Sequence, residues 1–348
     1  MSGRPGPASV GDATHRGNAA DAVEQCFILF ARRGAPQWIL EGDIKACFDR
    51  ISHSWLKANI PMDKTVLEQW LKAGYCERRQ WFPTEEGTPQ GGIASPTLAN
   101  MVLDGLQQAI AEAVPKRQKV NFVRYADDFI VTGNSRAILE KQVKPAIERF
   151  LQPRGLELSP EKTCVSHIDE GFDFLGFNIR NYGGKLLIKP AKKNVKAFLA
   201  KTREIIKSHP TAKAVNLIRL LNPVIRGWAN YYRHVVASQC FHRVDYHLGK
   251  AIRRWVHRRH PKKSVQWKQA RYFCRVGEDN WRFTAPTEVK RQPARILLLK
   301  AGRVSIQRHV KIRAQANPFD PQYRSYFAAR AKKVSTRITG SLSGLWRA

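Results

Sequence analysis

Two patterns of apolar and polar positions divide the chain near residue 180. Before that point, short apolar runs rich in β-branched and aromatic residues, typical of strands, alternate with amphipathic segments typical of helices. Beyond about residue 190, apolar residues recur at helical spacing only. The pattern therefore predicts a mixed α+β first part followed by a helical second part.

The first part is predicted to be an α+β domain, in which an antiparallel sheet carries helices on one face. Ser135 is a predicted helix cap, Ser95 with Pro96 opens another helix, and Asp63 caps a third. The expected strands are residues 38–44, a hairpin at 121–133, 156–158 and 172–179. The expected helices are residues 20–33, 48–60, 63–74, 95–114 and 135–152.

The second part predicts helices at residues 192–208, 213–237 and 241–258. Aromatic residues and cations alternate along them, a mixture that suits phosphate contacts and base stacking. Trp and Tyr at helical spacing usually pack inward, so most of these aromatics are expected in the core. The cations are expected at the surface.

Two adjacent acids, Asp127 and Asp128, interrupt the apolar hairpin at residues 121–133. Two carboxylates at a hairpin tip in apolar surroundings need a counter-charge, and Mg²⁺ suits carboxylate oxygens. A bare Asp-Asp pair also makes an ordinary polar turn, so the metal hypothesis needs a third carboxylate. Asp43 ends the strand at 38–44 and is expected to lie beside the hairpin.

The charge distribution changes the picture of the second part. The chain has a net charge of +32, with 60 basic and 28 acidic residues. Residues 1–180 carry 22 of each sign, whereas residues 181–348 carry 38 basic and 6 acidic residues. A folded, strongly basic half predicts a polyanionic partner, most simply RNA or DNA.

The six cysteines form no pair with zinc-ligand spacing, so a zinc site is not expected. Scattered cysteines without a signal peptide fit a reducing compartment, the bacterial cytoplasm near the nucleoid or, alternatively, an organelle. No apolar run approaches the roughly 20 residues that cross a membrane, and no membrane partner is expected. Residues 1–19 predict a disordered tail.

At this point a family resemblance is clear. YADD with its flanking apolar residues resembles the catalytic box of reverse transcriptases, and LEGDIKACFDRISHSWL resembles the box with the other metal-binding aspartate. GTPQGGIASPTLANMVLDGL and GFDFLGFNI resemble two further blocks. NPVIRGWANYYRHV is similar to the maturase domain of group II intron-encoded proteins, and ANPFDPQYRSYFAAR to the segment that follows it.

The resemblance implies a polymerase palm with a thumb and maturase region of basic helices. It implies that Asp43, Asp127 and Asp128 bind two Mg²⁺ ions, with Mn²⁺ as an alternative, assisted by the Ile44 carbonyl. Two such ions activate a 3′-hydroxyl and stabilise charge on the transferred phosphoryl group. The expected substrates are dNTPs, and the expected macromolecular partners are intron RNA and target DNA.

The resemblance assigns further roles to matching positions. Phe48 would exclude ribonucleotides at the sugar 2′ position, although a core aromatic is the plain alternative. Gln90 and Gly91 would line the nucleotide pocket. Lys162 would neutralise phosphate or protonate pyrophosphate, with a solvated lysine nearly as plausible. Leu175 and Gly176 would form the primer-gripping hairpin. Candidate RNA contacts are Arg226, Arg233, Arg253, Arg254, Arg258 and Arg259.

The expected domains are the tail at 1–19, a fingers remnant and palm at 20–184, a thumb and maturase domain at 185–285, and a basic nucleic-acid-binding segment at 286–348. Compared with the family, the long N-terminal fingers region and the C-terminal zinc-bearing HNH endonuclease are expected to be missing. Three hypotheses follow: an RNA-directed DNA polymerase and maturase, a polymerase-inactive maturase-like RNA-binding protein, and a degenerate fragment. A homodimer is left open.

Overall fold

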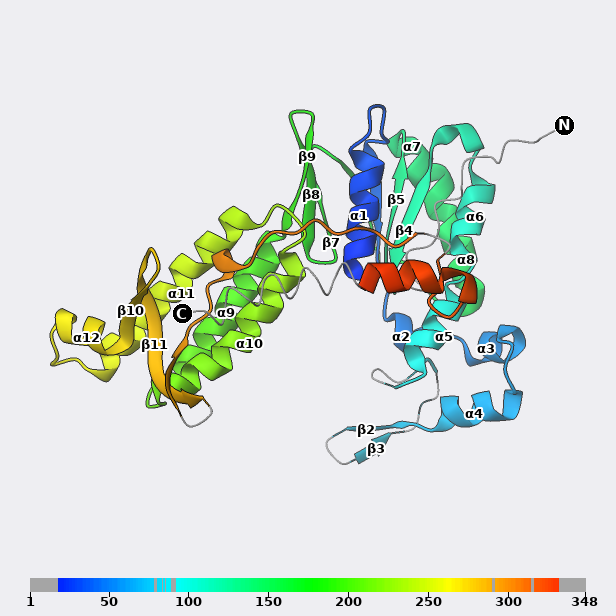
Figure 1. Cartoon of the computed structure of the whole chain (residues 1–348). Helices are drawn as coiled ribbons and strands as arrows, with labels where there is room; N and C mark the ends of the chain where they lie inside the picture. The colour runs from blue at the N-terminus through cyan, green and yellow to red at the C-terminus, as the bar shows by residue number, and fades with distance from the viewer. Residues whose placement is uncertain are drawn as a thin grey trace. The chain divides into compact units, whose positions relative to one another are not determined.

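The computed structural model describes residues 18–77, 80–82, 84, 86–88, 92–289, 292–313 and 316–331. The chain forms two compact units (Figure 1). The first unit comprises Met1–His167 together with Val310–Ala348, and the second comprises Ile168–His309. The first unit is therefore built from two pieces of sequence that lie far apart in the chain.

The first unit contains a four-stranded antiparallel sheet with the strand order β4-β5-β1-β6. β4 and β5 form the predicted hairpin, and β1 pairs with both β5 and β6. The strands are β1 (Trp38–Gly42), β4 (Asn121–Tyr125), β5 (Asp128–Gly133) and β6 (Cys164–His167). The predicted antiparallel sheet is confirmed.

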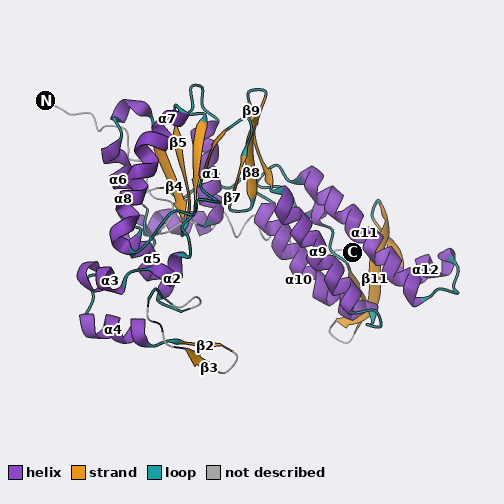
Figure 2. Ribbon diagram, turned by 180° about the vertical axis from the view of Figure 1, so that it is seen from behind, coloured by secondary structure: helices purple, strands orange, loops and turns teal. Residues whose placement is uncertain are grey.

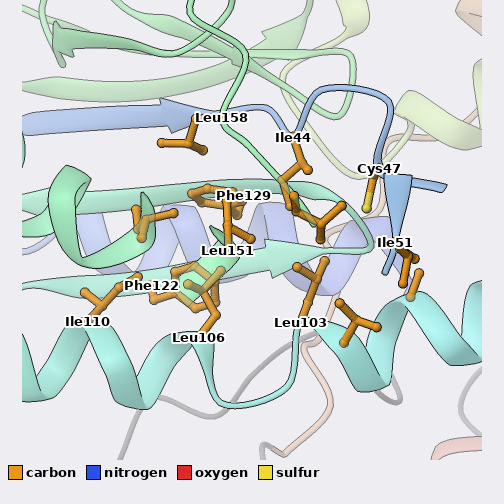
Figure 3. Packing of buried hydrophobic residues seen from close by; sticks show 14 of the residues in the cluster. Ile44, Cys47, Ile51, Leu103, Leu106, Ile110, Phe122, Phe129, Leu151 and Leu158 are labelled. Atoms are coloured by element: carbon orange, nitrogen blue, oxygen red, sulfur yellow. The ribbon is translucent and has the colours of Figure 1, made fainter. Parts of the chain in front are cut away.

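One face of this sheet carries the main core. Phe122 and Phe129 lie with their ring centroids 5.7 Å apart and face Leu103, Leu106 and Ile110 from the helical layer (Figure 3). Because side chains alternate along a strand, every second residue of β1, β4 and β5 enters this core. The covering helices are α5 (Ser95–Val102), α6 (Leu106–Ala113) and α8 (Lys144–Leu151).

The opposite face of the sheet is covered as well, so the expectation of helices on one face only is wrong. Ile39, Val123 and Ile130 alternate with the residues of the main core and are buried. Helix α1 (Ala19–Phe30) contacts β4 on this side (Figure 1). The sequence of α1 is amphipathic, which explains why it packs on a sheet but not which sheet face it covers.

Two predicted long helices are each broken into two. Residues 48–60 form α2 (Cys47–Arg50) and α3 (His53–Asn59), because Ile51 between them is extended. The helix predicted at residues 95–114 breaks at Gly105, which has a φ of 87° and begins α6. A left-handed residue cannot continue a right-handed helix, and glycine adopts this conformation without a side-chain clash.

The remaining elements of the first unit surround these layers. Asp63 and Ser135 act as the predicted helix caps, since their side chains accept hydrogen bonds from Val66 N and Ile138 N. The elements are α4 (Lys64–Lys72), β2 (Tyr75–Glu77), β3 (Gln80–Phe82), α7 (Arg136–Ile138) and the π-helix η2 (Leu139–Val143).

The second unit begins with an antiparallel sheet of three strands and continues with long helices (Figure 2). Trp228 stacks on Phe198 at 4.5 Å and also contacts Phe241, so these aromatics lie in the core as predicted. The elements are β7 (Phe172–Phe174), β8 (Phe177–Tyr182), β9 (Lys185–Pro190), α9 (Lys192–Ser208), α10 (Ala214–Tyr232) and α11 (Ser238–Arg259).

A second three-stranded antiparallel sheet follows these helices, which the helical periodicity does not predict. It has the order β10-β11-β12, and Phe283 and Ala285 of β11 are buried. The elements are α12 (Val265–Tyr272), β10 (Phe273–Val276), β11 (Asp279–Val289) and β12 (Gln292–Leu297). Across the described parts of both units, none of the helices is both long and apolar enough to span a bilayer.

Gly42 is the residue whose lack of a side chain the main sheet requires. A Cβ atom at Gly42 would lie 2.2 Å from two ring carbons of Phe129, its cross-strand partner. Overpacking of this kind costs about 1–3 kcal/mol. We expect Gly42→Ala to lower the free energy of unfolding by that amount, measured by urea titration with hydrogen exchange of the β1 amides.

The control is Gly227→Ala on α10, where a Cβ atom would meet nothing within 4 Å. Alanine favours a helix over glycine by about 1 kcal/mol, so this variant should be slightly stabilised. Equal losses in the two variants would contradict the steric explanation.

Candidate active site

The two adjacent aspartates lie at the tip of the β4–β5 hairpin. Tyr125 pairs with Asp128, which leaves Ala126 and Asp127 as a two-residue turn. Ala126 has a φ of 56°, the left-handed conformation that an L residue with a side chain rarely adopts. Asp127 is half-buried and Asp128 is exposed.

A fully buried arginine supports this turn from inside the unit. Arg124 has 0% exposure, and its Nη1 donates hydrogen bonds to the Ala126 carbonyl and to Asn100 Oδ1, both at 3.3 Å. A buried guanidinium requires such partners, because burial without them is costly. The Arg124 side chain therefore holds the carbonyl at the strained position next to Asp127.

Asp43 reaches the same end of the sheet from β1. The β1–β5 pairing ends at Gly42 and Phe129, and the next residues on the two strands are Asp43 and Asp128. The backbone after β1 is also fixed, since Ser159 N donates to the Asp43 carbonyl at 2.8 Å and Ile44 bridges to Leu158. The strand predicted at residues 156–158 is therefore reduced to this short bridge.

Lys162 lies beside Asp43. Its Nζ is 3.2 Å from Asp43 Oδ2, and the two side chains are 69% and 28% exposed. An ion pair at this exposure contributes little to stability and is screened by salt. The pair therefore places a mobile positive charge next to the first aspartate without locking that aspartate.

The electrostatics of Cys47 report that the two aspartate segments converge. Burial, together with the negative charges of Asp127, Asp43 and Asp49, raises the pKa of the Cys47 thiol to about 12, while the positive charge of Arg124 acts in the opposite direction. The carboxylates from the β1 end and from the hairpin tip thus lie near one side chain. The end of β1 and the hairpin tip thus lie at the same end of the sheet, and their use as one site stays a prediction.

The chemistry of these donors fits a hard divalent cation, but their arrangement is not a ready-made ligand set. Among the residues that the structure describes, no group of three or more His, Cys, Asp or Glu side chains is arranged to hold a metal ion. In this structure Asp43 is paired with Lys162. The assignment of Asp43, Ile44, Asp127 and Asp128 as metal ligands stays a prediction.

The other residues predicted at the nucleotide site are placed in part. The half-buried Phe48 packs against the main core, and its carbonyl accepts a hydrogen bond from Thr88 N at 2.6 Å. This contact holds Thr88, the residue that precedes the PQGG motif, against α2. Gln90 and Gly91 lie outside the described residues.

Two strained backbone positions lie within three residues of the predicted metal ligands in the sequence. Among the described non-glycine residues, φ is positive at Ala46, Lys119, Ala126 and Leu175. Ala46 precedes α2, Ala126 precedes Asp127, and Leu175 is at the β7–β8 turn predicted to grip the primer. Such strain persists where the surroundings enforce it, which is common at functional sites.

The predicted RNA-binding arginines do not all face solvent. Arg226, Arg253, Arg254 and Arg258 are exposed, whereas Arg233 and Arg259 are half-buried. Arg259 donates a hydrogen bond to the Ala212 carbonyl at 2.8 Å, which uses part of its guanidinium within the fold. The role of all six in binding RNA stays a prediction.

A basic groove lies between α9 and α11 of the second unit. Its volume is about 170 Å³, and no acid is among the described residues that line it. The basic side chains in the groove are Arg203, Lys207, His247, Lys250, Arg254 and Arg258. Sequence reasoning had singled out only the last two, because the α9 cations look like an ordinary solvated face until the two helices are seen to pair.

Two segments of the chain match different known families. Residues 16–179 match the family described as reverse transcriptase (RNA-dependent DNA polymerase). The first part of the chain is thus a reverse transcriptase domain, of a family that generally uses divalent metal ions. Residues 195–273 match the group II intron, maturase-specific domain. The chain thus joins a reverse transcriptase segment to a group II intron maturase-specific segment, the combination that the resemblance implied.

Individual relatives share between a quarter and a third of their aligned residues with this chain. The group II intron-encoded protein LtrA of Lactococcus lactis subsp. cremoris is 25% identical, over 57% of this chain and 49% of that protein. An uncharacterised 91 kDa protein in the cob intron of Schizosaccharomyces pombe is 30% identical, over 62% of this chain and 36% of that protein. The chain spans half or less of the length of these curated relatives.

Among solved structures, apo telomerase from Candida tropicalis aligns with 71% of this chain and 51% of its own. The TM-score is 0.42 and the identity is 13%.

Arg124 was missed by sequence reasoning, although an arginine inside the apolar run NFVRY is an available signal of a buried charge. We expect Arg124→Met to lower the free energy of unfolding by about 1–3 kcal/mol, because the buried acceptors on Ala126 and Asn100 lose their donor. Thermal and urea unfolding would measure the change. The control Arg117→Met, at an exposed position in the same unit, should change stability by less than about 0.5 kcal/mol. Equal effects would refute the bracing role of Arg124.

Proposed function

We propose that this chain is an RNA-directed DNA polymerase and maturase of a group II intron, which copies RNA into DNA and binds intron RNA for splicing and mobility. The observation that carries the proposal is the meeting of Asp43 with the Asp127–Asp128 turn at one end of the sheet. The matches to the reverse transcriptase and maturase-specific families support the same function. The chain spans only part of the length of its relatives.

Asp43, Asp127 and Asp128, with the Ile44 carbonyl, would hold two Mg²⁺ ions, with Mn²⁺ as a substitute. When bound, such ions supply activation of the primer 3′-hydroxyl and stabilisation of the charge on the transferred phosphoryl group. The rigid ends of β1 and β5 would keep the carboxylates in place. Lys162, 3.2 Å from Asp43, would neutralise phosphate or give a proton to pyrophosphate.

Other predicted residues would contact the nucleotide and the primer. Phe48, whose ring packs against the core, would stand against the sugar and exclude ribonucleotides, so that dNTPs are used. Gln90 and Gly91 would line the same pocket. Leu175 and Gly176 at the β7–β8 turn would grip the primer strand.

The second unit would bind the polyanions. The groove between α9 and α11 offers several cations within one hollow, which suits the closely spaced phosphates of RNA. The maturase-specific match points to intron RNA as this ligand. The proposal also includes target DNA as a ligand, a homodimer, domain limits at residues 184 and 285, and a cytoplasmic or organellar location.

A second candidate function is that of a polymerase-inactive maturase-like protein that only clamps RNA. The observation that favours it is the Asp43–Lys162 ion pair, which engages one of the predicted metal ligands. The two candidates differ in whether this chain extends a primer.

The first test replaces Asp127 and Asp128 together by asparagine. We expect primer extension on an RNA template with Mg²⁺ to fall at least about 100-fold, because charge stabilisation at the reacting phosphate is lost. Affinity for structured RNA should change less than about twofold, since the basic side chains remain. Chelation should stop the wild-type reaction, and added Mg²⁺ or Mn²⁺ should restore it.

Asp104→Asn is the matched control, because Asp104 is an exposed aspartate of the same unit with no proposed role in the site. This variant should extend primers as the wild type does. If the wild-type chain binds structured RNA but extends no primer, the polymerase proposal is wrong and the RNA-clamp function stands. Joint loss of extension and RNA binding in the double variant would show that the aspartates are structural.

The second test replaces Arg254 and Arg258 by glutamine. Each lost phosphate contact should lower the slope of log affinity against log salt by about 0.7–0.9. We therefore expect RNA affinity to fall roughly tenfold at low salt, with less difference at high salt. Fluorescence anisotropy with a labelled RNA hairpin, at several KCl concentrations, would measure both quantities.

The control variant, Arg117→Gln with Lys141→Gln, removes the same charge from exposed positions of the first unit. If this control weakens RNA binding as much as the groove variant does, the effect comes from net charge and the groove is not the binding site.

A further inference from the structure

The turn between β7 and β8 has an unusual backbone. Phe174 pairs with Phe177, so Leu175 and Gly176 form a two-residue turn with φ values of 51° and 79°. Glycine accepts this conformation readily, but leucine does so only at a cost in free energy. Something outside the turn must therefore hold Leu175 in place.

Two adjacent tyrosine hydroxyls at the end of α10 meet the turn. Tyr231 Oη donates to the Leu175 carbonyl at 2.8 Å, and Tyr232 Oη donates to the Gly176 carbonyl at 3.1 Å. Ala191 N donates to the same Gly176 carbonyl at 2.9 Å. Both carbonyls of the strained turn are thus fixed by named donors.

The turn is closely packed against aromatic side chains. Phe177 is fully buried, and its ring centroid lies 5.2 Å from that of Tyr231 and 5.0 Å from that of Tyr232. A Cβ atom on Gly176 would lie 2.9 Å from Asn194 Nδ2 and 3.0 Å from Tyr232 Oη. Burial also raises the pKa of Tyr232 to about 12, so its hydroxyl stays protonated and remains a donor at neutral pH.

These contacts join the two family segments. Leu175 and Gly176 belong to the reverse transcriptase match, which ends at residue 179, whereas Tyr231 and Tyr232 belong to the maturase-specific match at 195–273. All four residues lie in the second compact unit. The turn is therefore anchored by helices of the maturase segment.

We propose that Tyr231 and Tyr232 are positioning residues for the polymerase reaction: their hydroxyls set the Leu175–Gly176 turn in the shape that receives the primer strand. This inference rests on the proposed function, because it assigns the turn to primer binding. It adds that the maturase-specific segment controls how firmly the primer is held.

The experiment uses the full chain with Tyr231→Phe, Tyr232→Phe and the double variant, which keep the aromatic packing and remove only the hydroxyls. We expect the primer KM to rise about fivefold in each single variant and at least about tenfold in the double variant, with kcat within twofold. Hydrogen exchange of the amides at residues 174–178 should become faster. Gly176→Ala, which disturbs the same turn from the other side, should also raise the primer KM.

The matched control is Tyr182→Phe, at the far end of β8 from the turn and 41% exposed. This variant should match the wild type in primer KM. The inference is overturned if the double variant has a normal primer KM. It is also overturned if the rise in primer KM comes with lower kcat, weaker RNA binding and a lower unfolding temperature, since that pattern describes a purely structural role.

The failure of the proposed function would look different. If the wild-type chain extends no primer, the affinity of a labelled primer–template duplex replaces the KM measurement. Weaker duplex binding by the double variant, but not by Tyr182→Phe, would still support the inference. Equal duplex binding by all variants would overturn it.

Discussion

The antiparallel pairing of β1 with β5 is the interaction on which the site depends. It brings Gly42 against Phe129 so closely that no side chain fits between them, and it therefore fixes the register of the two strands. A slip by one residue would exchange the side chains on the two faces of the sheet and move Asp43 away from the hairpin tip. Backbone hydrogen bonds and one close ring contact thus decide where three carboxylates stand.

The two units divide the physical work. The sheet unit holds acids at the ends of rigid strands and tolerates local strain at Ala46 and Ala126, because buried groups such as Arg124 hold the turns. The second unit packs Phe198 and Trp228 in its interior, and basic side chains line the groove between α9 and α11. Neither property requires the other, which is consistent with separate family matches for the two segments.

Much of the fold, and the position of the aspartate hairpin within it, could be predicted from the sequence. The hairpin with Asp127 and Asp128 was readable because its strands are continuous apolar runs, and α9 was readable because its periodicity is regular. The break at Gly105 and the sheet β10-β11-β12 were not, since local pattern does not reveal which helix or strand tertiary packing will select. The Lys162 contact with Asp43 joins residues over a hundred positions apart, and only the fold shows it.

In the first unit, residues 311–312 form hydrogen bonds with α1. Asp21 of α1 is buried, and its carboxylate accepts a hydrogen bond from Ile312 N at 2.8 Å, while Lys311 donates to Gln25 of the same helix. In the sequence, α1 precedes the whole second unit, whereas the segment that bonds to it follows that unit. During synthesis these hydrogen bonds can therefore form only after the second unit has been made.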